Sequence, residues 1–286
     1  MINKLYLLLI TLFLSSYFYS IVEEDPLPTL GDYSSASISL SGEYELGRIW
    51  LAMYRGSTKE HSDPLMRTYL EDLIYRLSET SEVRDRRFEF IILEDESINA
   101  FAAPGGIIGI NLGMFLNTKR EGELASVMCH ELAHLSQRHF ARSQNRSSPL
   151  ANALMILGSI AVAAASRNPE AIMIAPAAMQ QMSINYTRSN EKEADRIGFN
   201  NLVKAGFDPN DMTMMFQRMQ DKYQREDSEQ FSYLMTHPLP SERLTDMRIR
   251  ADNIKSPSEG SFRDNLDFYF MQKRPEIWAE KNTKRI

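Results

Sequence analysis

One run of the sequence, MCHELAH at residues 128–134, constrains the fold more than any other. It lies within residues 118–144, where apolar residues recur with the period of an α-helix, and this pattern predicts one long helix. Side chains at positions i and i+4 of a helix project from the same face, so His130 and His134 can bind one Zn²⁺ ion between them. The spacing therefore predicts a metal site on a helix that packs against the core.

The residue that follows the first of these histidines, Glu131, suits the same chemistry. A carboxylate beside a metal-binding histidine can act as general base towards a water molecule. The alternative is an ordinary charged helix with two surface histidines. Burying two histidines and a glutamate without a partner would cost several kcal/mol, and this cost favours the metal site.

A third ligand has to come from elsewhere, because a catalytic zinc ion usually has three protein ligands and one open position. The run SNEKEAD at residues 189–195 offers Glu191 and Asp195, again one helical turn apart. One carboxylate can bind the metal, and the other can accept the free N–H of a ligating imidazole and fix its tautomer. A solvated charged face would have the same spacing, so the spacing alone leaves both interpretations open.

Helical geometry excludes two nearby residues from the metal. At about 100° per residue, Glu193 points about 160° away from Glu191. By the same rule, His139 lies about 140° around the helix from His134. We therefore predict that His139 does not bind the ion and has a structural role.

The remaining patterns predict an α+β fold that is mostly α. Residues 87–93 alternate and then run apolar, as a strand does. The turn signal Pro104-Gly105-Gly106, within residues 99–115, predicts a hairpin or the edge of a sheet. Helical periodicity marks the segments 42–80, 191–205 and 210–226.

The N-terminal residues 1–20 contain one charge, then an apolar run, then a stretch rich in Ser and Tyr, as a secretory signal peptide does. An uncleaved anchor is the alternative, and in both cases we expect an exported protein with an extended arm at 21–41. The net charge of -6 does not provide the basic surface that nucleic-acid binding needs. Cys129 is the single cysteine, so no internal disulfide can form.

Two further segments are less specific. The apolar stretch 150–182, interrupted at 167–170, predicts two helices joined by a polar turn. Its small residues suit buried packing, and a lid or a contact with a membrane surface is the alternative. The tail, 256–286, is polar and loosely patterned, without a tetratricopeptide repeat.

Four motifs in order carry a resemblance to a known family, and together they cover about residues 25–270. They are INAFAAPGGIIGINLGMF, HELAH, NEKEADRIG and THPLPSER. The chain resembles the gluzincin group of metallopeptidases that includes the CAAX prenyl proteases, and most closely its periplasmic members that act in β-barrel assembly. The resemblance implies a zincin-like domain at 42–255, with a small β-sheet whose edge strand lies beside the active-site helix.

The resemblance also implies roles for particular residues. Glu191 is the third zinc ligand, and Asp195 is the partner of a zinc-binding histidine. His237 can take the fourth zinc position and hold the enzyme at rest, and Arg243 lies where it can steady an oxyanion. The edge strand binds an extended substrate through backbone hydrogen bonds. Its residues are Asn99, Ala100, Phe101, Ala102 and Ala103.

Together, these features predict a periplasmic zinc endopeptidase with one Zn²⁺ per chain, which cleaves unfolded or misassembled outer-membrane proteins and has a chaperone-like role in quality control. Similar proteins engage the outer-membrane assembly machinery through tetratricopeptide repeats, so recruitment of that machinery by this chain is left open. One alternative is a non-proteolytic assembly chaperone with a closed structural zinc site, against which Glu131 argues. The other is an integral-membrane prenyl-type protease, supported by residues 150–182 alone.

Overall fold

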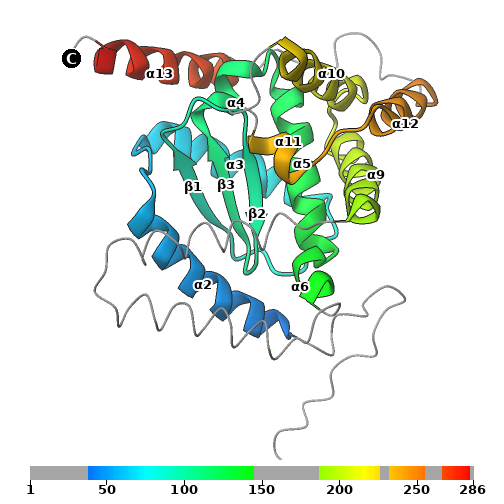
Figure 1. The fold of residues 1–286 in the computed structure, drawn as a ribbon, viewed down its shortest axis with the longest axis horizontal. Helices are drawn as coiled ribbons and strands as arrows, with labels where there is room; N and C mark the ends of the chain where they lie inside the picture. Colours follow the sequence, from blue (N-terminus) through cyan, green and yellow to red (C-terminus); the bar gives the residue numbers. More distant parts are fainter. Residues whose placement is uncertain (1–37, 145–186, 226–231, 255–265, 284–286) are drawn as a thin grey trace, which may run out of the picture. The chain divides into compact units, whose positions relative to one another are not determined.

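The computed structural model describes residues 38–144, 187–225, 232–254 and 266–283 of the 286-residue chain. Figure 1 shows a small β-sheet with helices packed around it. The helices are α2 (Leu40–Ser57), α3 (Pro64–Glu79), α4 (Leu112–Asn117), α5 (Glu121–Ser136), α6 (His139–Gln144), α9 (Arg188–Lys204), α10 (Asn210–Arg225), α11 (Ser232–Thr236), α12 (Ser241–Asp252) and α13 (Leu266–Thr283). The predicted mixed, mostly helical fold is confirmed.

The sheet has three strands in the order β1-β3-β2. β1 (Glu89–Leu93) runs parallel to β3 (Ile107–Asn111), and β2 (Ala100–Ala103) runs antiparallel to β3. The β2–β3 turn contains Gly105 and Gly106 with φ of 77° and 76°, a backbone conformation that glycine adopts without steric cost. This hairpin confirms the turn signal, and it leaves β2 at the edge of the sheet.

The two faces of the sheet are buried under different helices, because successive side chains of a strand point in opposite directions. Ile91 and Leu93 of β1 pack with Leu51 of α2 on one face. Phe90 and Ile92 point to the other face and join the main core, to which α3, α5, α9 and α10 contribute. Helices therefore cover both faces of the sheet. Among the described strands β1 and β2 form its two edges, and residues 59–61 bond to the edge at β1.

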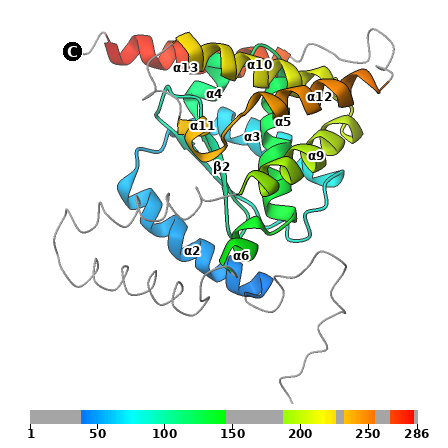
Figure 2. The ribbon, with the colours of Figure 1, turned by 45° about the vertical axis from the view of Figure 1, so that its right-hand side comes forward.

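Helix α5 runs through the middle of the main core. Every residue from Gly122 to His134 is buried. Figures 1 and 2 show α5 between the edge strand β2 and helix α9, and the same elements are in contact. The histidines and the glutamate at 130–134 are thus buried. Without a partner, their burial would cost free energy.

The prediction of a single helix over 118–144 is wrong at one point. α5 ends at Ser136 and α6 begins at His139. Between them Arg138 has a φ of 50°, in the left-handed region, which costs a non-glycine residue about 1–2 kcal/mol. The Arg138 side chain helps to offset this cost, because it donates to Glu43 of α2 at 2.9 Å and to the carbonyl of Ile38. The break changes the direction in which His139 points.

Four other helices of the described residues were not predicted: α4, α11, α12 and α13. α4 follows β3 directly and is buried with Met114 and Phe115. The segment expected to be a loosely patterned tail contains α13, which packs on α3 and α4 and buries Phe268 and Met271. Its apolar residues are too few and too unevenly spaced to give a helical pattern.

Several predictions concern residues outside those that the structure describes. These are the signal peptide at 1–20, the arm as far as residue 37, and the apolar stretch 150–182. In the part of the chain that is described, no helix combines the length and the apolar character needed to cross a bilayer.

Candidate metal centre

Four buried side chains converge from three separate parts of the chain. His130 and His134 come from α5, Glu191 from the first turn of α9, and His237 from the residue after α11. Their ligand atoms all lie within 4.8 Å of one another. The structure thus brings together all four residues predicted to bind the metal.

The spacing of these atoms fits one metal ion. His130 Nε2 lies 3.0 Å from His134 Nε2 and 3.3 Å from His237 Nδ1. Oxygens of Glu191 lie 3.5 Å from His130 Nε2 and 3.4 Å from His134 Nε2. Ligands bound at about 2.0–2.2 Å around a tetrahedral zinc ion are about 3.3–3.6 Å apart. Imidazole lone pairs this close repel each other unless a cation or a proton separates them, so this donor set fits zinc.

The close approach of α9 to α5 depends on Gly198. A Cβ at this position would lie 3.0 Å from the backbone of Cys129 and from the Cα of His130. Glu191 and Asp195 lie seven and three residues earlier, on the same face of α9. The missing side chain at Gly198 therefore lets both carboxylates reach the histidines of α5.

Glu131 lies beside the four converging side chains, and among the described residues neither of its carboxylate oxygens has a hydrogen-bonding partner of good geometry. Its Oε1 is 3.5 Å from His237 Nε2, and the backbone N–H of Ala102 in β2 is nearby. Burial raises the pKa of Glu131, although His237 and His130 oppose the shift. A carboxylate with a raised pKa and unused oxygens suits proton transfer to and from a substrate.

His130 is supported by a buried ion pair between α9 and α12. Its Nδ1 lies 3.0 Å from Asp195 Oδ1, an ion-pair distance without the direction of a good hydrogen bond. Asp195 in turn accepts from Arg243 at 2.6 and 2.7 Å. Burial raises the pKa of Asp195, but His130 and Arg243 outweigh it, so the net shift is downwards. Asp195 therefore lies where it was predicted, behind His130, one of the predicted metal ligands.

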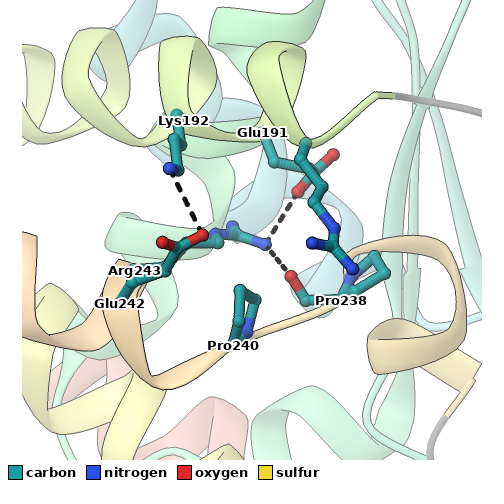
Figure 3. Close-up of a pocket in the computed structure, with 7 residues that line it drawn as sticks. Glu191, Lys192, Pro238, Pro240, Glu242 and Arg243 are labelled. Carbon is teal, nitrogen blue, oxygen red and sulfur yellow. Dashed lines mark hydrogen bonds and ion pairs between the residues drawn. The ribbon is translucent and has the colours of Figure 1, made fainter.

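Arg243 is enclosed rather than open to the site. Figure 3 shows its guanidinium between Glu191, at 2.9 Å, and the carbonyl of Pro238, to which it donates at 2.6 Å. The small pocket in this view is also lined by the ion pair of Lys192 with Glu242, at 3.2 Å. The contacts of Arg243 are those of a positioning residue, and its predicted contact with an oxyanion stays a prediction.

His139 contacts His134 directly, which the sequence did not predict. The two Nδ1 atoms are 2.9 Å apart, and His139 Nε2 lies 3.2 Å from Glu193. Burial lowers the pKa of His139 to about 4, so the ring is neutral near pH 7. The expected angle of about 140° assumed an unbroken helix, and the break at Arg138 removes that assumption. No Gly or Pro at residues 136–139 signals the break.

The predicted substrate-binding strand lies next to the site, with its side chains turned inward. Asn99, Ala100, Ala102 and Ala103 are buried. The half-buried ring of Phe101 packs edge-on against Trp50 and Tyr54 of α2, over Gly109. Among the described residues, the side chains of β2 are therefore mostly buried, and binding of a peptide at this edge stays a prediction.

Comparison with known proteins agrees with this site. Residues 64–251, about two thirds of the chain, match Peptidase family M48. The chain belongs to peptidase family M48. Its predicted identity as a metallopeptidase, and its predicted resemblance to proteases of β-barrel assembly, are confirmed.

Three relatives illustrate the similarity. The beta-barrel assembly-enhancing protease of Escherichia coli K12 is 37% identical over 257 residues, which cover 87% of this chain and 51% of that protein. A Vibrio cholerae protein, provisionally given the same name, is 42% identical over 239 residues, covering 81% of this chain and 49% of that protein. The mitochondrial metalloendopeptidase OMA1 of Schizosaccharomyces pombe is 25% identical over 234 residues, covering 80% and 66%. The chain spans about half the length of the two bacterial relatives.

Proposed function

We propose that this chain is a zinc endopeptidase, with its catalytic domain at residues 42–255. The observation that carries the proposal is the buried Glu131 carboxylate, which lies beside four converging metal donors and has no hydrogen-bonding partner of good geometry among the described residues. A carboxylate without a partner in a protein interior costs free energy. A role as general base next to a metal ion would explain why the protein keeps this carboxylate in spite of the cost.

His130, His134 and Glu191 would hold the metal ion. When bound, zinc polarises the scissile carbonyl and makes water a nucleophile near neutral pH. Glu131 accepts the proton of the attacking water and later donates it to the leaving amine. Asp195 holds His130 in position, and Arg243 holds Asp195 and Glu191.

An extended peptide is the substrate that the edge strand fits best. Among the described strands β2 lies at an edge, where its backbone can offer hydrogen bonds next to Glu131. Such bonds give affinity with little choice of sequence. This suits unfolded or misassembled proteins. The names of the bacterial relatives refer to β-barrel assembly, which supports β-barrel proteins as the substrates. We infer that these are outer-membrane proteins met in the periplasm.

His237 lies where it can close the site as a fourth ligand. Its Nδ1 lies 3.1 Å from both oxygens of Glu191, and its ring stacks on Tyr233 with centroids 4.6 Å apart. As a fourth ligand it would fill the position that substrate or water needs, so the enzyme would rest in a closed form. The same contact supports the second candidate function, an assembly chaperone with a structural zinc site, because four protein ligands are typical of structural zinc.

The experiment that tests the proposal compares Glu131→Gln with His237→Ala. Zinc content and cleavage of an unfolded protein such as casein are measured for each, with and without a chelator. We expect Glu131→Gln to keep its zinc and lose cleavage. We expect His237→Ala to keep its zinc and to cleave faster than the unchanged protein.

Two results would contradict the proposal. Undiminished cleavage by Glu131→Gln would remove the mechanism. Loss of zinc from His237→Ala, together with no cleavage by the unchanged protein, would favour the chaperone with a structural site.

A further inference from the structure

A chain of polar groups holds the side of His134 that faces away from the metal donors. His134 Nδ1 lies 2.9 Å from His139 Nδ1, and His139 Nε2 lies 3.2 Å from Glu193 Oε2. The same oxygen of Glu193 accepts from Arg142 at 2.9 Å. We refer to Glu193, His139 and His134 as the histidine chain.

The donors and acceptors of the histidine chain follow from its outer end. An ionised carboxylate only accepts hydrogen bonds, so His139 Nε2 has to carry the proton that faces Glu193. The Nδ1 of the neutral His139 ring then presents a lone pair to His134. His134 Nδ1 donates its N–H to that lone pair, which leaves His134 Nε2 with the lone pair that a metal needs.

Burial keeps this arrangement fixed. The side chain of His139 is fully buried and that of His134 is 1% exposed. Turning the His139 ring over would present carbon atoms to both partners and break both hydrogen bonds. The ring orientation of His139 therefore determines which nitrogen of His134 is protonated.

We propose that His139 is a positioning residue for His134, and that with Glu193 as its acceptor it selects the tautomer in which His134 Nε2 binds the metal. This inference rests on the proposed metal site. The function given to His139 lies beyond the ligand set, because its own nitrogens do not join the cluster of four donors.

The test replaces His139 in two ways. His139→Leu removes the acceptor, whereas His139→Asn keeps an oxygen close to the position of Nδ1. Zinc affinity is measured by competition with a chromophoric chelator, and we expect it to fall about 10–100-fold in His139→Leu and to stay within about threefold in His139→Asn. The visible absorption bands of the Co²⁺-substituted protein should change in His139→Leu and be restored in His139→Asn.

Controls separate this effect from general damage to the fold. Phe140→Leu alters a buried neighbour on α6 outside the histidine chain, so it should lower the melting temperature and leave zinc affinity within about twofold. If His139→Leu does not fold, Glu193 provides a second pair, because its side chain is 34% exposed and tolerates substitution. Glu193→Leu should weaken zinc binding, and Glu193→Gln, whose amide oxygen still accepts from His139, should not.

The outcomes are distinguishable from failure of the proposed function. An unchanged zinc affinity and cobalt spectrum in His139→Leu, or equal losses in His139→Leu and Phe140→Leu, would overturn the positioning role while the metal site stands. Absence of zinc binding by the unchanged protein would overturn the proposed function, and the positioning role with it.

Discussion

The two metal-site histidines of α5 are supported in contrasting ways. His130 is backed by the charged pair Asp195–Arg243, which joins α9 to α12 and is buried. His134 is backed by a neutral histidine from the next helix, and the charge of Glu193 lies farther out, partly exposed. The first support, Asp195–Arg243 behind His130, depends on tertiary structure and on buried charge. The second support, His139–Glu193 behind His134, depends on the chain direction after α5 and on the direction of hydrogen bonds.

This contrast suggests different vulnerabilities. A buried ion pair is expensive to break, because the remaining charge stays in the interior. A hydrogen bond between neutral groups is cheaper to lose, but it controls which nitrogen is protonated. Damage to the first support should therefore affect stability most, and damage to the second should affect metal binding most.

The largest effect is expected for Arg243→Leu. Removing this guanidinium leaves Asp195 and Glu191 as unbalanced buried charges, so the free energy of unfolding of the metal-free protein should fall by about 3–5 kcal/mol. Urea unfolding followed by circular dichroism measures it. Arg243→Lys is the matched control, and it should lose less because it keeps the charge without the paired contact. A loss of about 1 kcal/mol or less in the free energy of unfolding is typical of a surface ion pair. Such a small loss would contradict a stabilising role of the buried Asp195–Arg243 pair behind His130.

Gly198→Ala is expected to disturb both supports at once, since Asp195 and Glu193 both lie on α9. The added methyl group would meet the α5 backbone at 3.0 Å, and such overpacking costs about 1–3 kcal/mol. Zinc affinity should fall in parallel. Gly56→Ala in α2 is the control, because nothing lies within 4 Å of its Cβ, and this change should stabilise the protein. Similar results for both variants in urea unfolding would show that the α5–α9 contact is not tight.

Arg138→Val is expected to act on the second support alone. A left-handed backbone conformation costs an L-residue about 1–2 kcal/mol, and a β-branched residue at a φ of 50° pays at least this much. If the backbone relaxes to relieve the strain, His139 turns away from His134. Arg138→Gly is the matched variant, because it loses the same ion pair with Glu43 but accepts the backbone angle. We expect Arg138→Val to bind zinc more weakly than Arg138→Gly in chelator competition. Equal zinc affinities of the two variants would show that the left-handed conformation at residue 138 does not influence the metal site.

The smallest effect is expected for Arg142→Ala. The ion pair of Arg142 with Glu193 is about one third exposed on both sides, and such pairs contribute about 0–1 kcal/mol. Stability and zinc affinity should therefore stay close to those of the unchanged protein. A clear loss of zinc affinity in the chelator competition would show that the histidine chain extends to Arg142.

The same contrast explains how much of the site could be predicted from the sequence. His130 and His134 are readable because helical spacing fixes which side chains share a face. The same rule places Asp195 on one face with Glu191, but its role came from the family motif. His237 is reached through a motif and not through geometry, since it lies far from the other ligands along the chain. His139 was assigned away from the site because Gln137 and Arg138 give no signal of a break. A left-handed residue held by a side-chain contact with a distant helix leaves no local pattern.

The elements of the fold also divide into those set by local sequence and those set by distant contacts. The hairpin at Pro104-Gly105-Gly106 and the strand at 87–93 were predictable, because turn chemistry and alternation are local properties. Helix α13 was not, because it is defined by what it packs against: Phe268 and Met271 are buried in a core built by α3 and α4. Packing partners that are distant in sequence decide such an element.

The left-handed residue Arg138 has a consequence for protein design. Grafting the five residues HELAH onto a straight helix of another scaffold would transfer two ligands and a base. It would leave the second histidine free to adopt either tautomer, because no following helix would return an acceptor to its Nδ1. The smallest transferable unit is therefore longer, and it runs from the motif through the break to His139. It also needs two acidic side chains on neighbouring helices, one like Glu43 to hold the break and one like Glu193 to orient the His139 ring.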